Sequence, residues 1–217
     1  MDDEPSNQTT KEQVIEALSP IQRRIISASS DIRSKPPDKA DFLHSVMCQA
    51  GLPRSRVEGR AFSRSAGGVS IEIEAGSLWD GKNWVEQPLP YGTKPRLMLV
   101  HLSSEAVIKK RRDVEIGSSI RSFLETLGIS ATGGRNGSYN SFKAQMMALA
   151  ACRMRIGLLG KSGHARTVDT LMIEEVETWL HPTTLASTHA TWRGTIVLSQ
   201  KFYDTLIEHA VPLDRRA

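Results

Sequence analysis

The side chains best suited to chemistry in this sequence are basic and amide groups, and they gather in three places. One is a run of four basic residues at 109–112, and another is the stretch at 161–166. The third begins at residue 135, and no acidic residue occurs from there to residue 155. Asparagine amides can pair with adenine edges, whereas lysine, arginine, serine and tyrosine can hold phosphates. These residue types indicate contacts with double-stranded DNA. The candidate contact residues are Arg135, Asn136, Ser138, Tyr139, Asn140, Lys143, Lys109, Lys110, Arg111, Arg112, Lys161 and Arg166.

Patterns that would indicate an enzyme are incomplete. The Gly-Lys-Ser at 160–162 would end a phosphate-binding loop, but the glycine which that loop requires is replaced by Arg155. The six histidines show no metal-ligand spacing such as HExxH. The acidic group at 174–177 falls on a predicted strand, where a solvated edge explains it. We therefore expect a protein that is not an enzyme and that needs no metal and no cofactor.

Composition places the chain among ordinary globular proteins. Its 217 residues are 39% hydrophobic and 24% charged, with a net charge of +4, so one core is expected. Cys48 and Cys152 lie in apolar runs, which predicts two buried free thiols in a reducing compartment. The polar first twenty residues lack a signal-peptide pattern. No uninterrupted apolar run comes near the ~18 residues of a membrane span. We expect a cytoplasmic protein without a membrane partner.

The first third of the chain gives mixed signals. Residues 1–10 have nothing to bury, which predicts a disordered tail. Helical spacing over 11–27 contains Pro20, which predicts a kinked helix or two short ones. Asp38 is the expected cap of a further helix that carries Phe42, Val46 and Met47. The serine- and glycine-rich stretch 52–68 is expected to be a loop, and the alternation of Val69, Ile71 and Ile73 predicts a strand.

The remaining elements must position the basic groups. Residues 76–92 are expected to be turns, and 95–110 a helix. A helix capped by Ser118 and ended by Gly128 carries an apolar stripe that includes Phe123 and Leu127. A second helix starts near Ser138, with Phe142, Met146 and Leu149 on one face. We expect the two stripes to face each other. Alternation then predicts a strand over 154–158, a turn at 160–164, a return strand over 166–179, a strand at 195–198 and a final helix around Phe202.

This order is helix, turn, helix, strand, turn, strand, which is the layout of a winged helix. The predicted fold class is α+β: a winged helix, formed by a helix-turn-helix and a β-hairpin wing, with additional helices and a small antiparallel sheet. The domain is expected to span 11–217. The helix from about Ser138 to Ala151 is the predicted recognition helix.

Several long phrases carry a resemblance to a known family. They are LPYGTKPRLMLVHLSSEAV at 89–107, EIGSSIRSFLETLGISATGGRNGSYNSFKAQMMALAACRM at 115–154 and VLSQKFYDTLIEHAVPLDRRA at 197–217, with FLHSVMCQAGLPRS at 42–55. In these phrases the chain resembles the plasmid-encoded RepA replication initiators. The resemblance implies binding to repeated sites (iterons) at a plasmid origin, dimerisation, self-repression and recruitment of the host initiator and helicase. It also implies that this chain is the amino-terminal winged-helix portion of a longer protein with a second winged helix.

Two other functions remain open at this stage. One is a winged-helix transcriptional repressor that binds an operator, and the other is a dimerisation module with little DNA affinity of its own. A homodimer is also expected because the strand at 69–75 needs a partner and could lie at an open sheet edge.

Overall fold

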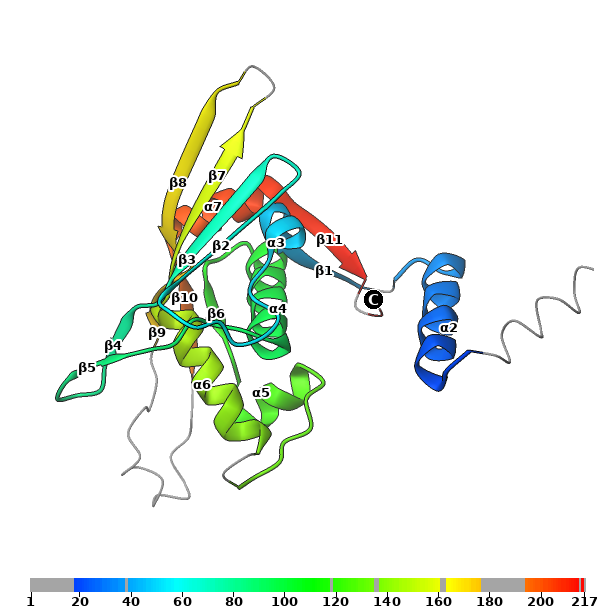
Figure 1. The fold of residues 1–217 in the computed structure, drawn as a ribbon. Coiled ribbons are helices and arrows are strands. Elements are labelled where there is room, and N and C mark those ends of the chain that lie inside the picture. The colour runs from blue at the N-terminus through cyan, green and yellow to red at the C-terminus, as the bar shows by residue number, and fades with distance from the viewer. Residues whose placement is uncertain are drawn as a thin grey trace, which may run out of the picture. The chain divides into compact units, whose positions relative to one another are not determined.

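The computed structural model describes residues 18–37, 39–117, 119–134, 137–160, 163–176, 194–214 and 216. The chain divides into two units, one formed by Met1–Asp41 with Leu213–Ala217 and the other by Phe42–Pro212. The helices and strands in chain order (Figure 1) are α2 (Pro20–Ser34), β1 (Ala40–His44), α3 (Ser45–Ala50), β2 (Ala61–Ala66), β3 (Val69–Glu74), β4 (Ser77–Trp79), β5 (Trp84–Glu86), α4 (Thr93–Lys109), β6 (Asp113–Glu115), α5 (Ile120–Thr126), α6 (Ser138–Ala151), β7 (Arg153–Leu159), β8 (Ala165–Leu171), β9 (Ile173–Val176), β10 (Thr195–Leu198), α7 (Gln200–His209) and β11 (Ala210–Asp214).

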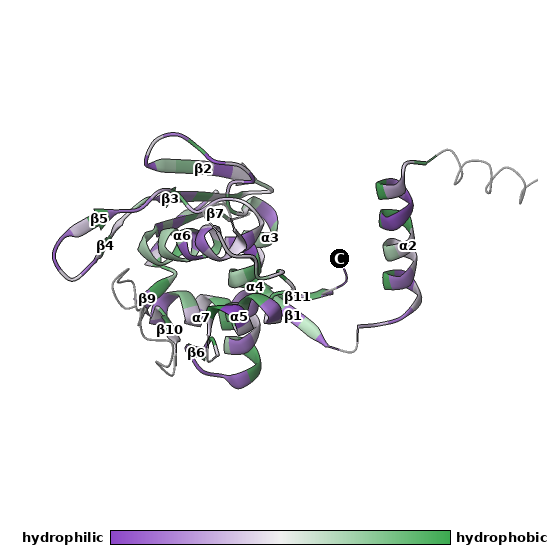
Figure 2. Ribbon diagram, turned by 90° about the horizontal axis from the view of Figure 1, so that it is seen from below, coloured by the Kyte–Doolittle hydropathy of each residue, from purple (hydrophilic) through white to green (hydrophobic). Residues whose placement is uncertain are grey.

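The larger unit is built around an antiparallel sheet with the strand order β2-β3-β7-β8. Its inner face is apolar, because Ile71, Ile73, Met154 and Ile156 are all buried. Helix α3 packs on β2 and β3, and α7 packs on β8. Figure 2 shows the helices gathered on one side of this sheet. The sheet and these helices enclose the core of the unit.

The outer face of the same sheet is polar and held by ion pairs across the strands. Arg155 on β7 donates to Glu72 at 2.7 Å and to Glu74 at 2.8 Å. The neighbouring Arg153 donates to Asp169 on β8 at 2.7 Å. Because these pairs join residues far apart in sequence, they stabilise the register of β3, β7 and β8.

A second sheet has the strand order β6-β10-β9. The single return strand expected over 166–179 is wrong, because it is interrupted at Met172 into β8 and β9, which belong to different sheets. The side chain of Met172 is completely buried, and its carbonyl accepts a hydrogen bond from the Ser199 amide at 3.1 Å. Burial of this residue fixes the bend between the two sheets. Residues 177–179 of the expected strand lie outside the described residues.

Three expectations for residues 38–92 are wrong. Phe42 lies on strand β1, and the helix that follows begins at Ser45 with His44 as its cap. The expected loop at 52–68 contains strand β2, and the expected turns at 76–92 contain the short β4–β5 hairpin. Strand β2 was missed because its side chains alternate only between exposed and half-buried, so its sequence carries little apolar signal.

Of the kinked helix or two short helices expected over 11–27, the described residues show one helix that begins at Pro20, the first position of α2, after the cap residue Ser19, while residues 11–17 lie outside the described residues. Proline suits this position because its missing N–H would have no helical partner there. Cys152 is buried as expected, whereas Cys48 is exposed, which corrects its predicted burial. Strand β3 is also not an edge strand, since it pairs with both β2 and β7. The sheet-edge argument for a homodimer therefore fails.

The other elements expected from apolar spacing are confirmed. The expected helix at 95–110 is α4, and the helix pair that follows is α5 and α6. The predicted contact between the helix pair is present, because the Phe123 and Phe142 rings meet edge to face with centroids 5.6 Å apart. Both side chains are buried, at 2% and 0% exposed. Leu127 lies half-buried against the same core.

Candidate nucleic-acid interface

Helix α5 is short and strongly capped. Its N-cap is Ser119, which accepts from the Ser122 amide at 3.0 Å, while Ser122 accepts from the Ser119 amide at 3.2 Å. The expected cap Ser118 is therefore wrong by one residue. The helix ends before Gly128, whose φ of +71° is the left-handed conformation that glycine tolerates at a helix end. The chain then turns towards α6 as the sequence predicts.

The turn between α5 and α6 is closed by the side chain of Ser138. Its hydroxyl donates to the Ser130 carbonyl at 2.6 Å and accepts from the Thr132 amide at 2.8 Å. Asn140 Nδ2 donates to the Gly134 carbonyl at 3.0 Å. Two of the predicted DNA-contact residues thus also fix the shape of the turn. Arg135 and Asn136 lie outside the described residues.

The turn between α5 and α6 leaves no room for a side chain at Gly137. A Cβ atom there would lie 2.3 Å from the Thr132 carbonyl oxygen and 2.5 Å from that of Gly133. Gly137→Ala is expected to lower the free energy of unfolding by about 1–3 kcal/mol, because the backbone of the turn must move. The matched control is Gly133→Ala, since a Cβ at Gly133 meets no atom within 4 Å. Thermal unfolding of both variants measures the difference, and equal midpoints would contradict the close approach.

The exposed part of α6 is confined to its first two turns. Asn140, Ser141 and Ala144 are exposed, whereas Lys143 and Tyr139 are half-buried. Further along, Gln145, Met146, Ala148 and Leu149 are buried, so they cannot reach a groove of DNA. The predicted recognition helix therefore has the predicted bounds, but only its start is available for contact.

The start of α4 lies beside this exposed part of α6. Lys94 Nζ contacts Ser141 Oγ, and the Tyr91 amide donates to Gln145 Oε1 at 2.8 Å. Sequence reasoning missed Lys94 because this residue falls between the turns expected at 76–92 and the helix expected at 95–110. The structure instead places this lysine on the first turn of α4, next to α6.

Three arginines form a further basic group. The pKa of Arg96 lies below its usual value because of burial and because of the nearby charges of Arg54 and Arg64. Arg96 donates to the Leu52 carbonyl, and the Arg64 guanidinium lies 5.2 Å from the centre of the Phe62 ring. In the described part of the chain no acidic side chain pairs with any of the three. The repulsion among these three positive charges would be relieved by a bound anion such as a phosphate.

We call Arg54, Arg64 and Arg96 the arginine cluster, and the loop that carries Arg54 is hydrogen-bonded to the segment that precedes Lys94. The Gly92 amide donates to the Pro53 carbonyl at 2.9 Å, which holds the loop before Arg54 against the residues that precede Lys94. The sequence signal was the run of Arg54, Arg56, Arg60 and Arg64, but nothing in that run indicated its neighbour Arg96.

The four basic residues at 109–112 are mostly engaged within the chain. Lys109 pairs with Glu105 at 2.6 Å, and Arg111 lies 3.5 Å from Asp113 and 3.3 Å from Glu115. Arg112 pairs with Glu174. Lys110 is exposed at the end of α4 in a left-handed conformation, with φ +54°. Helix α4 separates Lys94 from Lys109 by about 22 Å.

The β7–β8 hairpin lies away from the start of α6. Figure 1 shows the tip of this hairpin and the α5–α6 turn at opposite ends of the larger unit. Arg166 is exposed near the tip, and Lys161 lies outside the described residues. The structure thus does not bring the predicted hairpin contacts together with those of α6.

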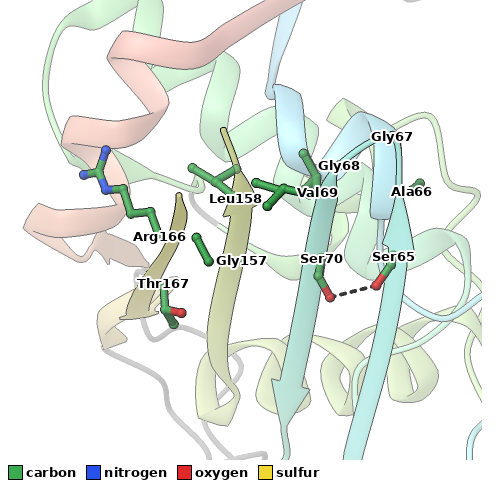
Figure 3. Close-up of a pocket in the computed structure, with 12 residues that line it drawn as sticks. Ser65, Ala66, Gly67, Gly68, Val69, Ser70, Gly157, Leu158, Arg166 and Thr167 are labelled. Atoms are coloured by element: carbon green, nitrogen blue, oxygen red, sulfur yellow. Dashed lines mark hydrogen bonds between the residues drawn. The ribbon is translucent and has the colours of Figure 1, made fainter. Parts of the chain in front are cut away.

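A shallow pocket of about 440 Å³ lies where the β2–β3 and β7–β8 hairpins meet. Small residues from four strands line it, and Ser65 donates to Ser70 at 2.9 Å (Figure 3). Of the described residues that line it, Arg166 alone is ionisable. No group of three metal-ligating side chains gathers in the described part of the chain. None of the described helices is long and apolar enough to cross a membrane.

Comparison with known proteins gives one family match. Residues 89–217 match the model of a family described as plasmid encoded RepA protein. No curated protein matches the chain. Among solved structures, domains 2 and 3 of RctB are similar, with 13% sequence identity and a TM-score of 0.45. That similarity covers 76% of this chain, and the chain spans 61% of the length of the RctB fragment.

Proposed function

Because this chain belongs to the family of plasmid-encoded RepA proteins, we propose that it is a plasmid replication initiator that binds double-stranded DNA at the iterons of a plasmid origin. The match spans α4 to β11, so it includes the helix pair and Lys94. Two members of the arginine cluster, Arg54 and Arg64, precede the matched region.

One observation carries the proposal: a basic side chain without an acidic partner among the described residues lies against the exposed start of α6. Lys94 contacts Ser141, and the Gly92 amide near Lys94 is hydrogen-bonded to the Pro53 carbonyl, which precedes Arg54 of the arginine cluster. An unpaired cation beside an exposed helix start suits a DNA backbone, because each neutralised phosphate releases condensed counterions.

In the proposed complex, α5, α6 and the β7–β8 hairpin act as a winged helix. Lys94, Lys143 and the arginine cluster hold phosphates and so fix the orientation of the protein. The side-chain oxygen of Asn140, which accepts no hydrogen bond among the described residues, contacts a base edge in the major groove. Binding alone performs this role, and it requires no covalent step, nucleotide or metal. The β7–β8 hairpin, through Lys161 and Arg166, contacts the DNA backbone. Its contact point lies farther from α6 than that of the hairpin in a compact winged helix.

Lys94→Ala, Lys143→Ala and Arg135→Ala are each expected to weaken binding to origin-repeat DNA. Each loss of one phosphate contact should lower the slope of log affinity against log salt by about one unit. The measurement is a fluorescence-anisotropy titration at several salt concentrations, with scrambled DNA of equal length beside the repeat.

The matched control is Arg121→Ala, because Arg121 is an exposed arginine of α5 that pairs with Glu125 at 3.3 Å. Its affinity and salt slope should equal those of the parent protein. If the three basic variants bind as tightly as the parent at all salt concentrations, α6 is not the recognition helix.

The same titration separates the alternatives. Preference for a tandem array of repeats supports an initiator, whereas preference for a single palindrome supports a transcriptional repressor. An absence of measurable affinity supports a dimerisation module. Self-repression and contacts with the host initiator and helicase belong to the same proposal, and the family match is what supports them.

A further inference from the structure

A pocket of about 90 Å³ lies between one end of the four-stranded sheet and the helices that cover its inner face. Val69 of β3, Leu158 of β7 and Arg166 of β8 are consecutive partners across the strands, so their side chains lie on the same face. Ile156 and Val168 follow two residues farther along that face. The opposite wall is formed by the start of α3 and the last turns of α7. All of these residues belong to the larger unit.

The polar part of the lining carries hydrogen-bond donors and positive charge. The rings of His44 and His209 approach each other with centroids 5.9 Å apart, and Arg166 belongs to the opposite wall. The Arg166 side chain is exposed and has no hydrogen-bond or ion-pair partner in the described part of the chain. Glu208 lies 3.7 Å from His209 but does not line the pocket, and none of the described residues that line it is acidic. A negatively charged ligand would therefore complete this lining.

His44 contributes a donor that the folded chain leaves unused. Its Nδ1 accepts from the Val46 amide at 3.2 Å, so the proton of the neutral imidazole lies on Nε2. Nε2 is buried and donates to no acceptor among the described residues. Burial also lowers the pKa of His44 to about 4, so the ring is neutral at pH 7. A buried donor without a partner costs free energy, which the acceptor oxygen of a ligand would recover.

The rest of the lining is aliphatic and determines the other half of the ligand. A bare inorganic anion would leave this apolar surface without contacts, which is unfavourable. A cavity of roughly 150 Å³ admits benzene, so a pocket of about 90 Å³ suits a chain of about three or four carbons. The aliphatic residues are Val46, Val69, Ile156, Leu158 and Val168.

We propose that this pocket binds a short-chain aliphatic carboxylate, for which butyrate is the test compound. One carboxylate oxygen accepts from His44 Nε2, and the other pairs with the Arg166 guanidinium in a charge-assisted hydrogen bond. The hydrocarbon chain packs against the aliphatic residues of the sheet. This inference goes beyond the proposed DNA binding and does not rest on it.

A chemical-shift titration of the ¹⁵N-labelled full chain with butyrate at pH 7 tests binding at this place. The Val46 and Val168 amides should shift together, with a dissociation constant on the order of 0.1–1 mM for a ligand of this size. Affinity should rise about fourfold per methylene from acetate to butyrate and then level off, because the pocket is filled. Butanol and butylammonium lack the carboxylate and are the matched controls, which should bind about tenfold more weakly.

Two variants remove the two polar anchors. His44→Asn keeps an acceptor for the Val46 amide but has no donor at the Nε2 position, and Arg166→Gln removes the positive charge. Each should weaken butyrate binding on the order of tenfold. The matched controls are His164→Asn in the β7–β8 turn and Arg121→Gln on α5. Neither residue lines the pocket, so both variants should bind as the parent does.

Val168→Ile tests the pocket while the polar groups stay intact, which matters because His44→Asn also lowers stability. The added methylene occupies part of the pocket, so butyrate should lose more affinity than acetate does. The preferred chain should become shorter by about one carbon. An unchanged preference for chain length would place the acid elsewhere and overturn the proposal.

The remaining outcomes also decide the matter. Absence of shifts with every acid overturns the proposal, and so does butanol that binds as tightly as butyrate, since the pocket is then only an apolar void. Displacement of butyrate by equal concentrations of phosphate or chloride shows unspecific anion binding and overturns it as well. Arg166 is also a proposed DNA contact, whereas His44 is not. His44→Asn should therefore lose butyrate but keep its DNA affinity, which distinguishes failure of this proposal from failure of the proposed function.

Discussion

Replacing Phe123 with alanine is expected to lower the free energy of unfolding by about 3–5 kcal/mol. Phe123 is 2% exposed and lies where three helices meet. Its ring centroid is 5.6 Å from that of Phe142 on α6 and 5.2 Å from that of His101 on α4. Removal of the ring leaves a cavity between α4, α5 and α6 that their backbones cannot fill without moving.

The consequence for function follows from the same contacts. The angle between α5 and α6 depends on the Phe123–Phe142 pair, so the exposed start of α6 should lose its fixed orientation and DNA affinity should fall with stability. The thermal midpoint should drop by roughly 6–20 °C for a chain of this size. Glu125→Ala is the control, because Glu125 is exposed on the same helix and makes only a surface pair with Arg121. A midpoint that barely moves in Phe123→Ala would show that the helix pair does not share a core.

The second large effect is a loss of stability in acid that depends on His44. This side chain is 3% exposed, and its Nδ1 accepts a hydrogen bond from the Val46 amide at 3.2 Å, which requires Nδ1 to be unprotonated. Its Nε2 is buried without a hydrogen-bond partner in the described part of the chain. Burial, followed by the nearby charge of His209, lowers the pKa of His44 to about 4.

The sign of the effect follows from the lowered pKa. The unfolded chain binds a proton to His44 below the ordinary pKa of 6.5, whereas the folded protein resists protonation down to about 4. Stability is therefore fully present above pH 6.5 and is lost as the pH falls from 6.5 to 4, by about 3 kcal/mol. Chemical denaturation at a series of pH values measures this slope.

His44→Asn isolates the contribution, because asparagine keeps an acceptor for the Val46 amide but does not titrate. The variant should be less stable at pH 7, since it loses the stacking on Phe202, where the ring centroids are 6.0 Å apart. Its stability should nevertheless change less between pH 6.5 and 4 than that of the parent. His164→Asn is the control, because His164 is an exposed histidine of the β7–β8 turn. An unchanged slope in His44→Asn would show that other groups cause the acid sensitivity.

The elements whose signals are local could be predicted from the amino-acid sequence alone. Helices α4, α5 and α6 follow from apolar spacing, a cap or a terminal glycine, and the Phe123–Phe142 contact follows from two stripes joined by a short turn. Strands β3, β7 and β10 follow from alternation in the same way. Each of these signals is complete within one segment, because helix and strand periodicity are properties of neighbouring residues.

Which segments lie beside one another, and therefore which basic side chains are available, became known only from the three-dimensional fold. The run at 109–112 has the strongest sequence signal, yet Arg112 pairs with Glu174, a residue 62 positions away. Lys94 and Arg96 have weak signals, yet one contacts Ser141 and the other lies near Arg54 and Arg64. Likewise β3 became an inner strand because β2, which has almost no apolar pattern, pairs with it. Pairing of charges and strands depends on distance in space, and a linear sequence does not state which distant residues the folded chain brings within a few ångströms of each other.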